Sequence, residues 1–244
     1  MKSSKKPKVS VCMPVHNAEL WLAESIKSIV DQTFTDWEIV VVDDGSSDTS
    51  QMIVKHYASI LDESKFKYHY NNTNLGIART RNKAVELSSG EIICVQDADD
   101  ISQKERLEKV WAYFKRHQKI DLVFGSCQYI DMLGRPFHQV NAEPFLIERL
   151  RKENWIQHPT VAYRKKAFKD VGGYRSECKV IDDWFLYYDF WKHGKVLDGM
   201  NDVLAFYRVL PSGVSRSEEK ASEIKSMKEQ FLKEANEDTR SLAR

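Results

Sequence analysis

The stretch EIICVQDADD, residues 91–100, places three carboxylates directly behind an apolar run. The run EIICV is apolar and β-branched enough to predict a strand that is buried on both faces, as in a parallel sheet. Asp97, Asp99 and Asp100 then crowd three negative charges into four residues, which raises the pKa of each unless a positive group lies among them. The stretch therefore predicts a buried strand that ends in a polar site with a positive partner.

Three similar runs precede this strand, and each is followed by a segment with helical periodicity. Strands alternating with amphipathic helices are typical of an α/β fold, in which right-handed crossovers build a parallel sheet with helices on its faces. The predicted strands are 9–13, 38–42, 67–70 and 91–95, and the predicted helices between them are 20–30, 52–60 and 77–87.

After Asp100 the pattern becomes mixed. We expect helices at 103–117, 143–152 and 183–192, strands at 121–125, 161–164 and 203–208, and a hairpin turn at 133–136. Beyond residue 216, one narrow apolar stripe predicts a surface helix that packs on the body of the protein rather than on a partner; it consists of Ile224, Met227, Phe231 and Ala235. We divide the chain into a basic tail (1–7), an α/β half (8–100), a mixed half of the same domain (101–216) and a C-terminal amphipathic helix (217–244).

Composition excludes several classes of protein. With 37 basic and 36 acidic residues the net charge is +1. The chain as a whole therefore has no strong positive electrostatic field of the kind that would predict a nucleic-acid partner. The four cysteines form no CxxC pair, which fits a reducing compartment, and no apolar stretch approaches the roughly 18 residues of a membrane span. We expect a cytoplasmic protein. The basic start, with Lys2, Lys5, Lys6 and Lys8, offers a weak contact with the cytoplasmic face of an anionic membrane, although a solvated tail is the more common outcome.

Polar residues follow the first, second and fourth predicted strands, and the carboxyl ends of parallel strands share one edge of a sheet. They are PVHN (14–17), DDGSSD (43–48) and DADD (97–100). Arg79 and Arg81 lie in the first turns of a predicted helix, where the dipole disfavours cations, so a phosphate outside the helix would explain them.

Each of these features alone has an ordinary explanation, as a turn with a helix cap, a solvated loop or a solvated helix face. Their coincidence at one predicted edge favours a binding crevice.

Five motifs resemble the family 2 glycosyltransferases of the GT-A fold. They occur in the family's order between Lys8 and Arg208, and together they are far more specific than any one alone. The motifs are VSVCMPVHNAE (9–19), VVVDDGSSDTS (40–50), NLGIARTRN (74–82), VQDADD (95–100) and VIDDW (180–184). The resemblance implies a Rossmann-like, mostly parallel sheet flanked by helices, with a nucleotide-sugar-binding half at 8–100 and an acceptor-binding half at 101–216. It also implies metal-assisted, inverting transfer of a sugar, most often from a UDP-sugar, to a hydroxyl of a glycan or lipid-linked acceptor.

The resemblance also implies roles for individual residues. The acidic DxD motif, here Asp97-Ala98-Asp99, would hold Mn²⁺ or Mg²⁺ and the donor ribose, with Asp99 as the direct metal ligand and Asp97 as the ribose contact close to the metal. Carboxylate and phosphate oxygens are hard ligands that suit these ions. Asp44 would accept from the base N3–H, His16 would lie against the base, and Arg79 or Arg81 would face the base or the diphosphate. The full donor-binding set implied is Pro14, Val15, His16, Asn17, Glu19, Asp44, Gly76, Arg79, Arg81, Asp97 and Ala98.

The pair Asp182-Asp183 resembles the family's Glu-Asp motif, whose second acid is the catalytic base. We therefore expect Asp183 to take the proton of the acceptor hydroxyl, although an aspartate here could equally cap the following helix. The acceptor-side candidates are Asp182, Trp184, His158 and Trp155, the tryptophans either as a platform for a sugar ring or as core. Two positions depart from the family: Asp182 replaces the usual Glu, and Leu210 occupies the place of a common third metal ligand, His.

Rival functions fit less well. A sugar nucleotidyltransferase or a dinucleotide-binding dehydrogenase needs an early glycine-rich loop, and residues 11–25 contain no glycine. A catalytically silent homologue used as a binding module is expected to lose the DxD motif or the base, and both are present. An EF-hand at 43–54 would need Gly and Glu where this chain has Asp48 and Val54. Donor sugar, acceptor and oligomeric state are left open by these patterns.

Overall fold

The computed structural model describes residues 6–211, 218 and 220–242, with side chains up to residue 237. Most of the predicted basic tail and the start of the C-terminal helix expected at 217 lie outside these residues.

The first half of the chain forms the predicted parallel α/β unit. Its strands run in the spatial order β3-β2-β1-β4, all parallel to their neighbours. The alternation of strands and helices predicted for residues 8–100 is confirmed. The elements are β1 (Val9–Val15), α1 (Leu22–Val30), β2 (Trp37–Asp43), α2 (Ser50–Ile60), β3 (Phe66–Tyr70), α3 (Ile77–Leu87) and β4 (Ile92–Val95).

The second half continues the same sheet in mixed directions. The order beyond β4 is β8-β6-β9-β5, where β6 and β9 are parallel and the other neighbours are antiparallel, and β7 pairs with β6 as a hairpin. The strands are β5 (Ile101–Ser102), β6 (Leu122–Ile130), β7 (Pro136–Val140), β8 (Ala162–Arg164) and β9 (Leu197–Arg208). The helices are α4 (Arg106–Arg116), α5 (Ile147–Leu150), the 3₁₀ turn η1 (His158–Thr160), α6 (Lys165–Asp170), α7 (Asp182–Lys192) and α8 (Ala221–Leu242).

Several predicted bounds in this half were wrong. The helix expected over 143–152 is reduced to α5, since the backbone of Leu146 is extended and the helix begins only after it. Strands β6 and β9 extend well beyond 121–125 and 203–208. The two strands pair with each other along their whole length. Hydrogen bonds from the neighbouring strand therefore extend each of them into residues whose sequence has no clear strand pattern.

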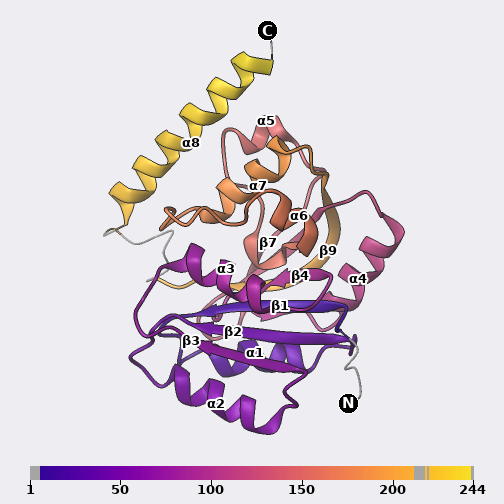
Figure 1. Ribbon diagram of the computed structural model, residues 1–244, viewed down its shortest axis with the longest axis vertical. Coiled ribbons are helices and arrows are strands. Elements are labelled where there is room, and N and C mark those ends of the chain that lie inside the picture. Colours follow the sequence, from indigo (N-terminus) through magenta and orange to yellow (C-terminus); the bar gives the residue numbers. More distant parts are fainter. Residues whose placement is uncertain (1–5, 212–217, 219, 243–244) are drawn as a thin grey trace.

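The core occupies both faces of the sheet, because side chains alternate along each strand. In β1, Val9, Val11, Met13 and Val15 face one cluster, together with residues of α1, α2 and α4, while Cys12 faces the other. Helices α3, α6, α7 and α8 supply this second cluster. In Figure 1, α1 and α2 accordingly lie on one side of the sheet and α3 and α7 on the other.

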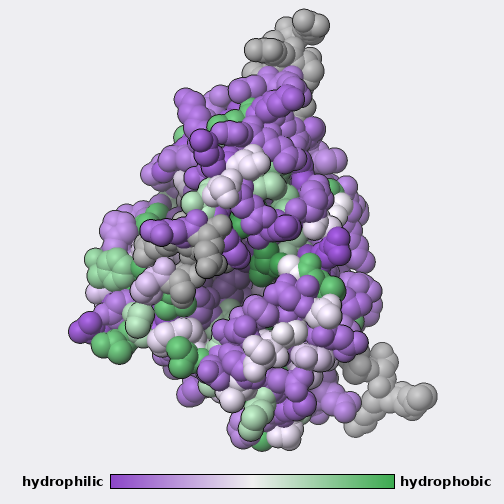
Figure 2. Space-filling model, turned by 90° about the vertical axis from the view of Figure 1, so that its left-hand side faces the viewer, coloured by the Kyte–Doolittle hydropathy of each residue, from purple (hydrophilic) through white to green (hydrophobic). Residues whose placement is uncertain are grey.

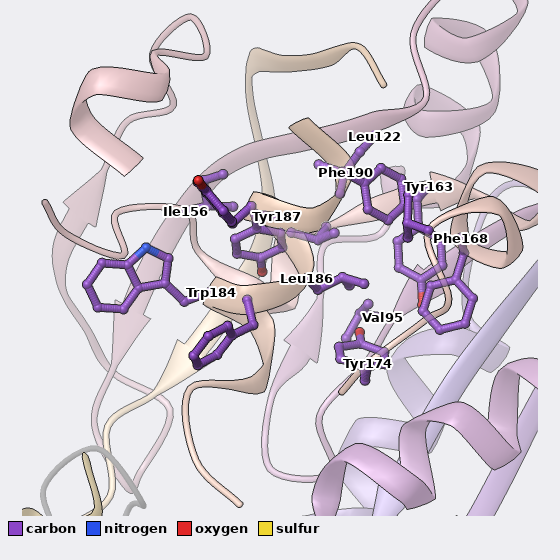
Figure 3. Packing of buried hydrophobic residues seen from close by; sticks show 14 of the residues in the cluster. Val95, Leu122, Ile156, Tyr163, Phe168, Tyr174, Trp184, Leu186, Tyr187 and Phe190 are labelled. Atoms are coloured by element: carbon purple, nitrogen blue, oxygen red, sulfur yellow. The ribbon is translucent and has the colours of Figure 1, made fainter. Parts of the chain in front are cut away.

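Helix α7 is buried on nearly all sides, which explains its aromatic composition. Its residues 184–188 and Phe190 are at most 2% exposed. Figure 3 shows the surrounding packing, in which Tyr163 stacks on Phe168 at a centroid distance of 5.0 Å and meets Phe190 at 5.8 Å. This dense packing fixes the position of the first turn of α7, where Asp182 and Asp183 lie.

Helix α8 packs on α7 through its apolar stripe. The Phe231 side chain is 1% exposed, and its ring lies 4.3 Å from that of Trp184 and 5.2 Å from that of Tyr188. Arg175 reinforces the contact by donating to both carboxylate oxygens of Asp189 on α7 and of Glu234 on α8, at 2.6 to 2.8 Å. Across the described part of the chain, none of the helices has the length and apolarity to span a bilayer.

Replacing Phe231 with Ala should destabilise the protein by about 3–5 kcal/mol, the usual cost of emptying a buried aromatic site. The neighbouring residue Leu232 is 37% exposed, so Leu232→Ala should cost less than about 1 kcal/mol. Urea unfolding of both variants measures the difference. Equal, small losses would show that α8 does not pack on the body in solution.

Candidate active site

The loops that follow β1 and β2 are joined into one unit. The Asn17 amide N–H donates to Ser46 Oγ at 3.0 Å, and Asn17 Oδ1 accepts from the Ser47 amide at 2.9 Å. Glu19 accepts from both the backbone and the hydroxyl of Thr49, at 3.0 and 2.7 Å. The carboxylate of Glu19 therefore holds the start of α2, a structural contact that competes with the donor-binding role expected for it.

Asp44 holds the loop before α3 against the end of β2. Its carboxylate is 3% exposed and accepts from Asn71 Nδ2 at 2.8 Å, from the Leu75 amide at 2.9 Å and from the Gly76 amide at 2.9 Å. Gly76 adopts φ 92°, a region that glycine enters without strain. His16 lies over this corner, with Nδ1 2.9 Å from the Asp44 carbonyl oxygen. These residues form a shared floor at the carboxyl edge of the sheet.

Some predicted donor-site residues offer only backbone to this floor. Pro14 is buried within β1, Val15 is 1% exposed and Ala98 is 7% exposed, and the last two side chains belong to the core. These buried residues position the backbone at the strand ends. The exposed polar side chains of His16 and Asn17 face outward from it.

Arg81 is the positive partner of Asp97, one of the three crowded carboxylates. One terminal nitrogen donates to Asp97 Oδ1 at 2.9 Å and the other to Asp182 Oδ2 at 2.7 Å, so one guanidinium joins residues 85 positions apart. Burial is the largest single influence and raises the pKa of Asp97, but the charge and the hydrogen bond of Arg81, together with the other positive groups nearby, hold that pKa below its usual value. The bridge ties the end of β4 to the start of α7.

Arg79 does not share this position. Two residues along a helix turn the side chain by about 200°, so Arg79 and Arg81 emerge on different sides of α3. Arg81 is 9% exposed, whereas Arg79 is exposed and lines a separate groove on the flank of the molecule. The structure thus brings one of the two predicted arginines to the carboxylates.

Arg208 holds the remaining acidic residues in place. Its backbone amide donates to Asp100 Oδ1 at 2.8 Å, its Nε donates to the Asp99 carbonyl oxygen at 3.0 Å, and a terminal nitrogen pairs with Glu24 at 2.6 Å. Burial and the neighbouring negative charges raise the pKa of Asp99 to about 6 and that of Asp100 well above its usual value.

The residues at the end of β4 fit a divalent cation that shares its ligands with a substrate. No ion pair within the described residues neutralises the Asp99 carboxylate, and its oxygens are hard donors. Among those residues, no three His, Cys, Asp or Glu side chains converge as a complete metal cage. Mg²⁺ is commonly held by one or two carboxylates plus phosphate oxygens and water, and this donor set matches that pattern.

The start of α7 is strained. Ile181 adopts φ 49°, which is rare for a β-branched residue and costs about 1–3 kcal/mol. The turn directs Asp182 to Arg81 and Asp183 to Asn154, whose Nδ2 donates to Asp183 Oδ2 at 2.8 Å. Burial and the charge of Asp182 raise the pKa of Asp183 to about 6. The N-cap residue is Ile181, which makes no side-chain capping bond, and both aspartates lie in the first turn rather than at the capping position.

The tryptophans predicted as a sugar platform are core residues instead. Trp184 is 2% exposed, donates from Nε1 to the Leu150 carbonyl oxygen at 2.6 Å and packs on α8. Trp155 is 8% exposed and meets Phe124 edge-on at 5.1 Å. Of the two roles considered for these tryptophans, their burial favours the core over a sugar platform.

His158 is also buried rather than open to an acceptor. It is 8% exposed, and Nδ1 lies 2.5 Å from Tyr187 Oη. Burial and the charge of Arg81 lower the pKa of His158 to about 3, so the imidazole is neutral at physiological pH. Its contacts make it part of the packing behind the carboxylates.

Three site residues escaped the sequence analysis. Asn154 lies in no recognisable pattern, and only the fold brings it to Asp183. Glu24 has the sequence context of an ordinary residue on a helix surface. Its ion pair with Arg208 could not be predicted from that context, because the two residues are 184 positions apart. Arg208 ends the last strand, and its sequence context assigned it no role. The face of the molecule in Figure 2 is hollowed near its centre, with both hydrophilic and hydrophobic residues around the hollow.

Comparisons with known proteins agree with this geometry. The family described as Glycosyl transferase family 2 matches residues 10–172. The glycosyltransferase EpsE of Bacillus subtilis is 33% identical over 208 residues, which cover 83% of this chain and 73% of EpsE. A crystal structure of S. aureus TarS with UDP has a TM-score of 0.68 and 26% identity, covering 93% of this chain and 70% of that one. The mannosyltransferase PcManGT of Pyrobaculum calidifontis, in complex with GDP-Man and Mn²⁺, shares the fold at 19% identity, with a TM-score of 0.66 over 86% of this chain and 59% of its own.

Arg81→Met should destabilise the protein by about 3–5 kcal/mol, because it leaves the buried carboxylates of Asp97 and Asp182 unpaired. Arg79→Met removes the same charge from the same helix at an exposed position and should stay within about 0.5 kcal/mol of the parent. Denaturant unfolding near neutral pH compares the two. Equal stabilities would refute the bridge.

Proposed function

Since the chain belongs to glycosyl transferase family 2 and is a glycosyltransferase, we propose that it transfers a sugar from a UDP-sugar to a hydroxyl of a glycan or lipid-linked acceptor, with inversion at the anomeric carbon. The single observation that carries this proposal is the Arg81 bridge. It holds the donor-side carboxylate Asp97 and the acid pair of α7 at one crevice. Groups that bind the leaving diphosphate and a group that accepts the proton of the attacking hydroxyl therefore lie close together.

The floor made by Asp44 and His16 is the proposed site of the base. A carboxylate offers about four lone-pair positions, and Asp44 uses three of them within the protein. The fourth would accept the N3–H of uracil, while the exposed ring of His16 lies beside it. The UDP bound by TarS, at 26% identity, supports a uridine nucleotide here.

Asp99 and Asp97 are the proposed ligands of a divalent cation, Mn²⁺ or Mg²⁺. When bound, such an ion would offset the negative charge that develops on the departing diphosphate. The Mn²⁺ in PcManGT supports this use of the shared fold. The protein contributes the unpaired Asp99 carboxylate and keeps Asp97 oriented through Arg81.

Asp183 is the proposed catalytic base. The acceptor oxygen bonds to the anomeric carbon as the bond from that carbon to the phosphate oxygen breaks, and the hydroxyl proton passes to Asp183. With a pKa of about 6, Asp183 is mostly ionised at neutral pH yet basic enough to accept a proton. Asn154 holds one of its oxygens, and Asp182 is committed to Arg81, so Asp183 is the acid of the pair that can serve the acceptor.

Mn²⁺ should strengthen UDP binding by at least about tenfold, equivalent to 1.4 kcal/mol. Asp99→Asn should abolish this gain while leaving the weak metal-free affinity nearly unchanged. Calorimetry of UDP binding in Mn²⁺ and in EDTA makes the comparison for both proteins. The same affinity in both buffers for the parent protein would contradict a metal-bridged diphosphate.

Asp183→Asn should lower the transfer rate by about 10²- to 10⁴-fold, the usual contribution of a general base. Because the deprotonated form is the active one, the parent rate should rise with pH through about 6, and the variant should lack this rise. Rates from pH 4.5 to 8 with an active donor and acceptor pair measure both effects.

Calorimetric UDP affinity is the control for the Asp183 variant, and it should stay within about twofold of the parent. If the variant keeps near-parental turnover and the same rise of rate with pH through about 6, Asp183 is not the catalytic base.

A further inference from the structure

A basic groove of about 780 Å³ lies at the edge of the sheet opposite the carboxylates. Arg164, which lines it, pairs in register with Ile92 at the start of β4, whereas Asp97 follows the end of β4. The length of a strand therefore separates the groove from the reacting atoms. We use the name basic groove for the cavity whose charged lining is Glu91, Lys115, Arg164, Lys165, Lys166 and Lys169.

Positive charge in this groove is not balanced by the protein. Glu91 is the acid in the lining, and it pairs with Arg164 at 3.3 Å. Within the described residues, Lys115, Lys166 and Lys169 have no ion pair. Burial and the charge of Lys169 lower the pKa of Lys165, which is a sign of mutual repulsion. In a chain of net charge +1, this concentration of cations indicates an anionic ligand.

The inner wall of the groove is already ordered. Arg164 donates from Nε to the Ile120 carbonyl oxygen at 2.9 Å and from a terminal nitrogen to the Phe114 carbonyl oxygen at 3.1 Å, and it lies over the Phe114 ring. Lys165 Nζ donates to the Ser88 carbonyl oxygen at 2.6 Å. Two cations are thus fixed in place before any ligand arrives, which reduces the entropy lost on binding.

The basic surface continues across α6. A second groove of about 690 Å³ shares Lys169 with the first and extends to Lys83 and Arg79 on α3. Arg79 carries no ion pair within the described part of the chain. Lys83 pairs with Glu86 in this second groove at 3.2 Å, so Arg79 and Lys169 are the cations of its lining that carry no ion pair within the described residues. Lys169 therefore lies between the two cavities, and a ligand able to use both must be elongated.

We propose that the basic groove binds a polyanionic chain, one that carries phosphate or carboxylate groups along its length, at a site separate from the catalytic crevice. The concave shape favours a chain over a bilayer, because a flat membrane surface cannot enter a cavity. This proposal goes beyond the transfer reaction and does not depend on it, since it concerns binding at the opposite edge of the sheet.

The test uses medium-chain inorganic polyphosphate as the probe, with fluorescence-detected binding to the full chain at several salt concentrations. The variant combines K115Q, K166Q and K169Q. Its matched control combines K55Q, K104Q and K228Q, which removes the same charge from exposed lysines on other parts of the surface. Melting temperatures of both confirm that they fold.

The groove variant should bind at least about tenfold more weakly than the control, with a salt slope smaller by roughly three units, one for each lost contact. E91Q should bind roughly two- to fivefold more tightly than the parent, since it removes the acid of the lining. Equal binding by the groove variant and the control would overturn the proposal. So would loss of binding to anionic phosphatidylglycerol vesicles in the groove variant together with unchanged polyphosphate binding, which would assign the surface to a membrane.

Discussion

The double ion pair of Arg81 is the contact on which the site depends. A buried guanidinium is stable only if its charge is matched, and here it is matched by carboxylates from two halves of the chain, Asp97 and Asp182. The same contact keeps Asp97 ionised despite its burial. Loss of Arg81 would leave both carboxylates uncompensated in the interior, and the two bonds form only when the two halves of the chain assemble together.

The second half of the molecule supports that contact with packing. Helix α7 is surrounded by aromatic side chains, and α8 covers its outer face through Phe231 and the Arg175 network. This dense environment can hold Ile181 in a left-handed conformation that would otherwise relax. The strained residue therefore directly precedes Asp182 and Asp183 and sets the direction of their side chains. Backbone strain of this kind is common at functional sites.

Charge is arranged differently at the two edges of the sheet. The carboxyl edge gathers acids whose repulsion is relieved by Arg81 and Arg208, and it leaves Asp99 free for a cation. The amino edge gathers lysines around Arg164, and Glu91 is the one acid among the residues that line its groove. A chain with almost no net charge can thus present one edge suited to a cation and a phosphate-bearing donor and another suited to an anionic chain.

The sequence by itself determined the parallel half and the strand-end motifs, because apolar periodicity and turn residues act over short distances. It also predicted that residues 97–100 need a positive partner, and in the structure Arg81 pairs with one of them, Asp97. Only the tertiary structure decided the length of β6 and β9, the burial of Trp155, Trp184 and His158, and the approach of Asn154 to Asp183. Each of these depends on groups distant in the sequence. A buried polar atom or the edge of a strand takes its hydrogen-bond partner from the residues that the fold brings beside it.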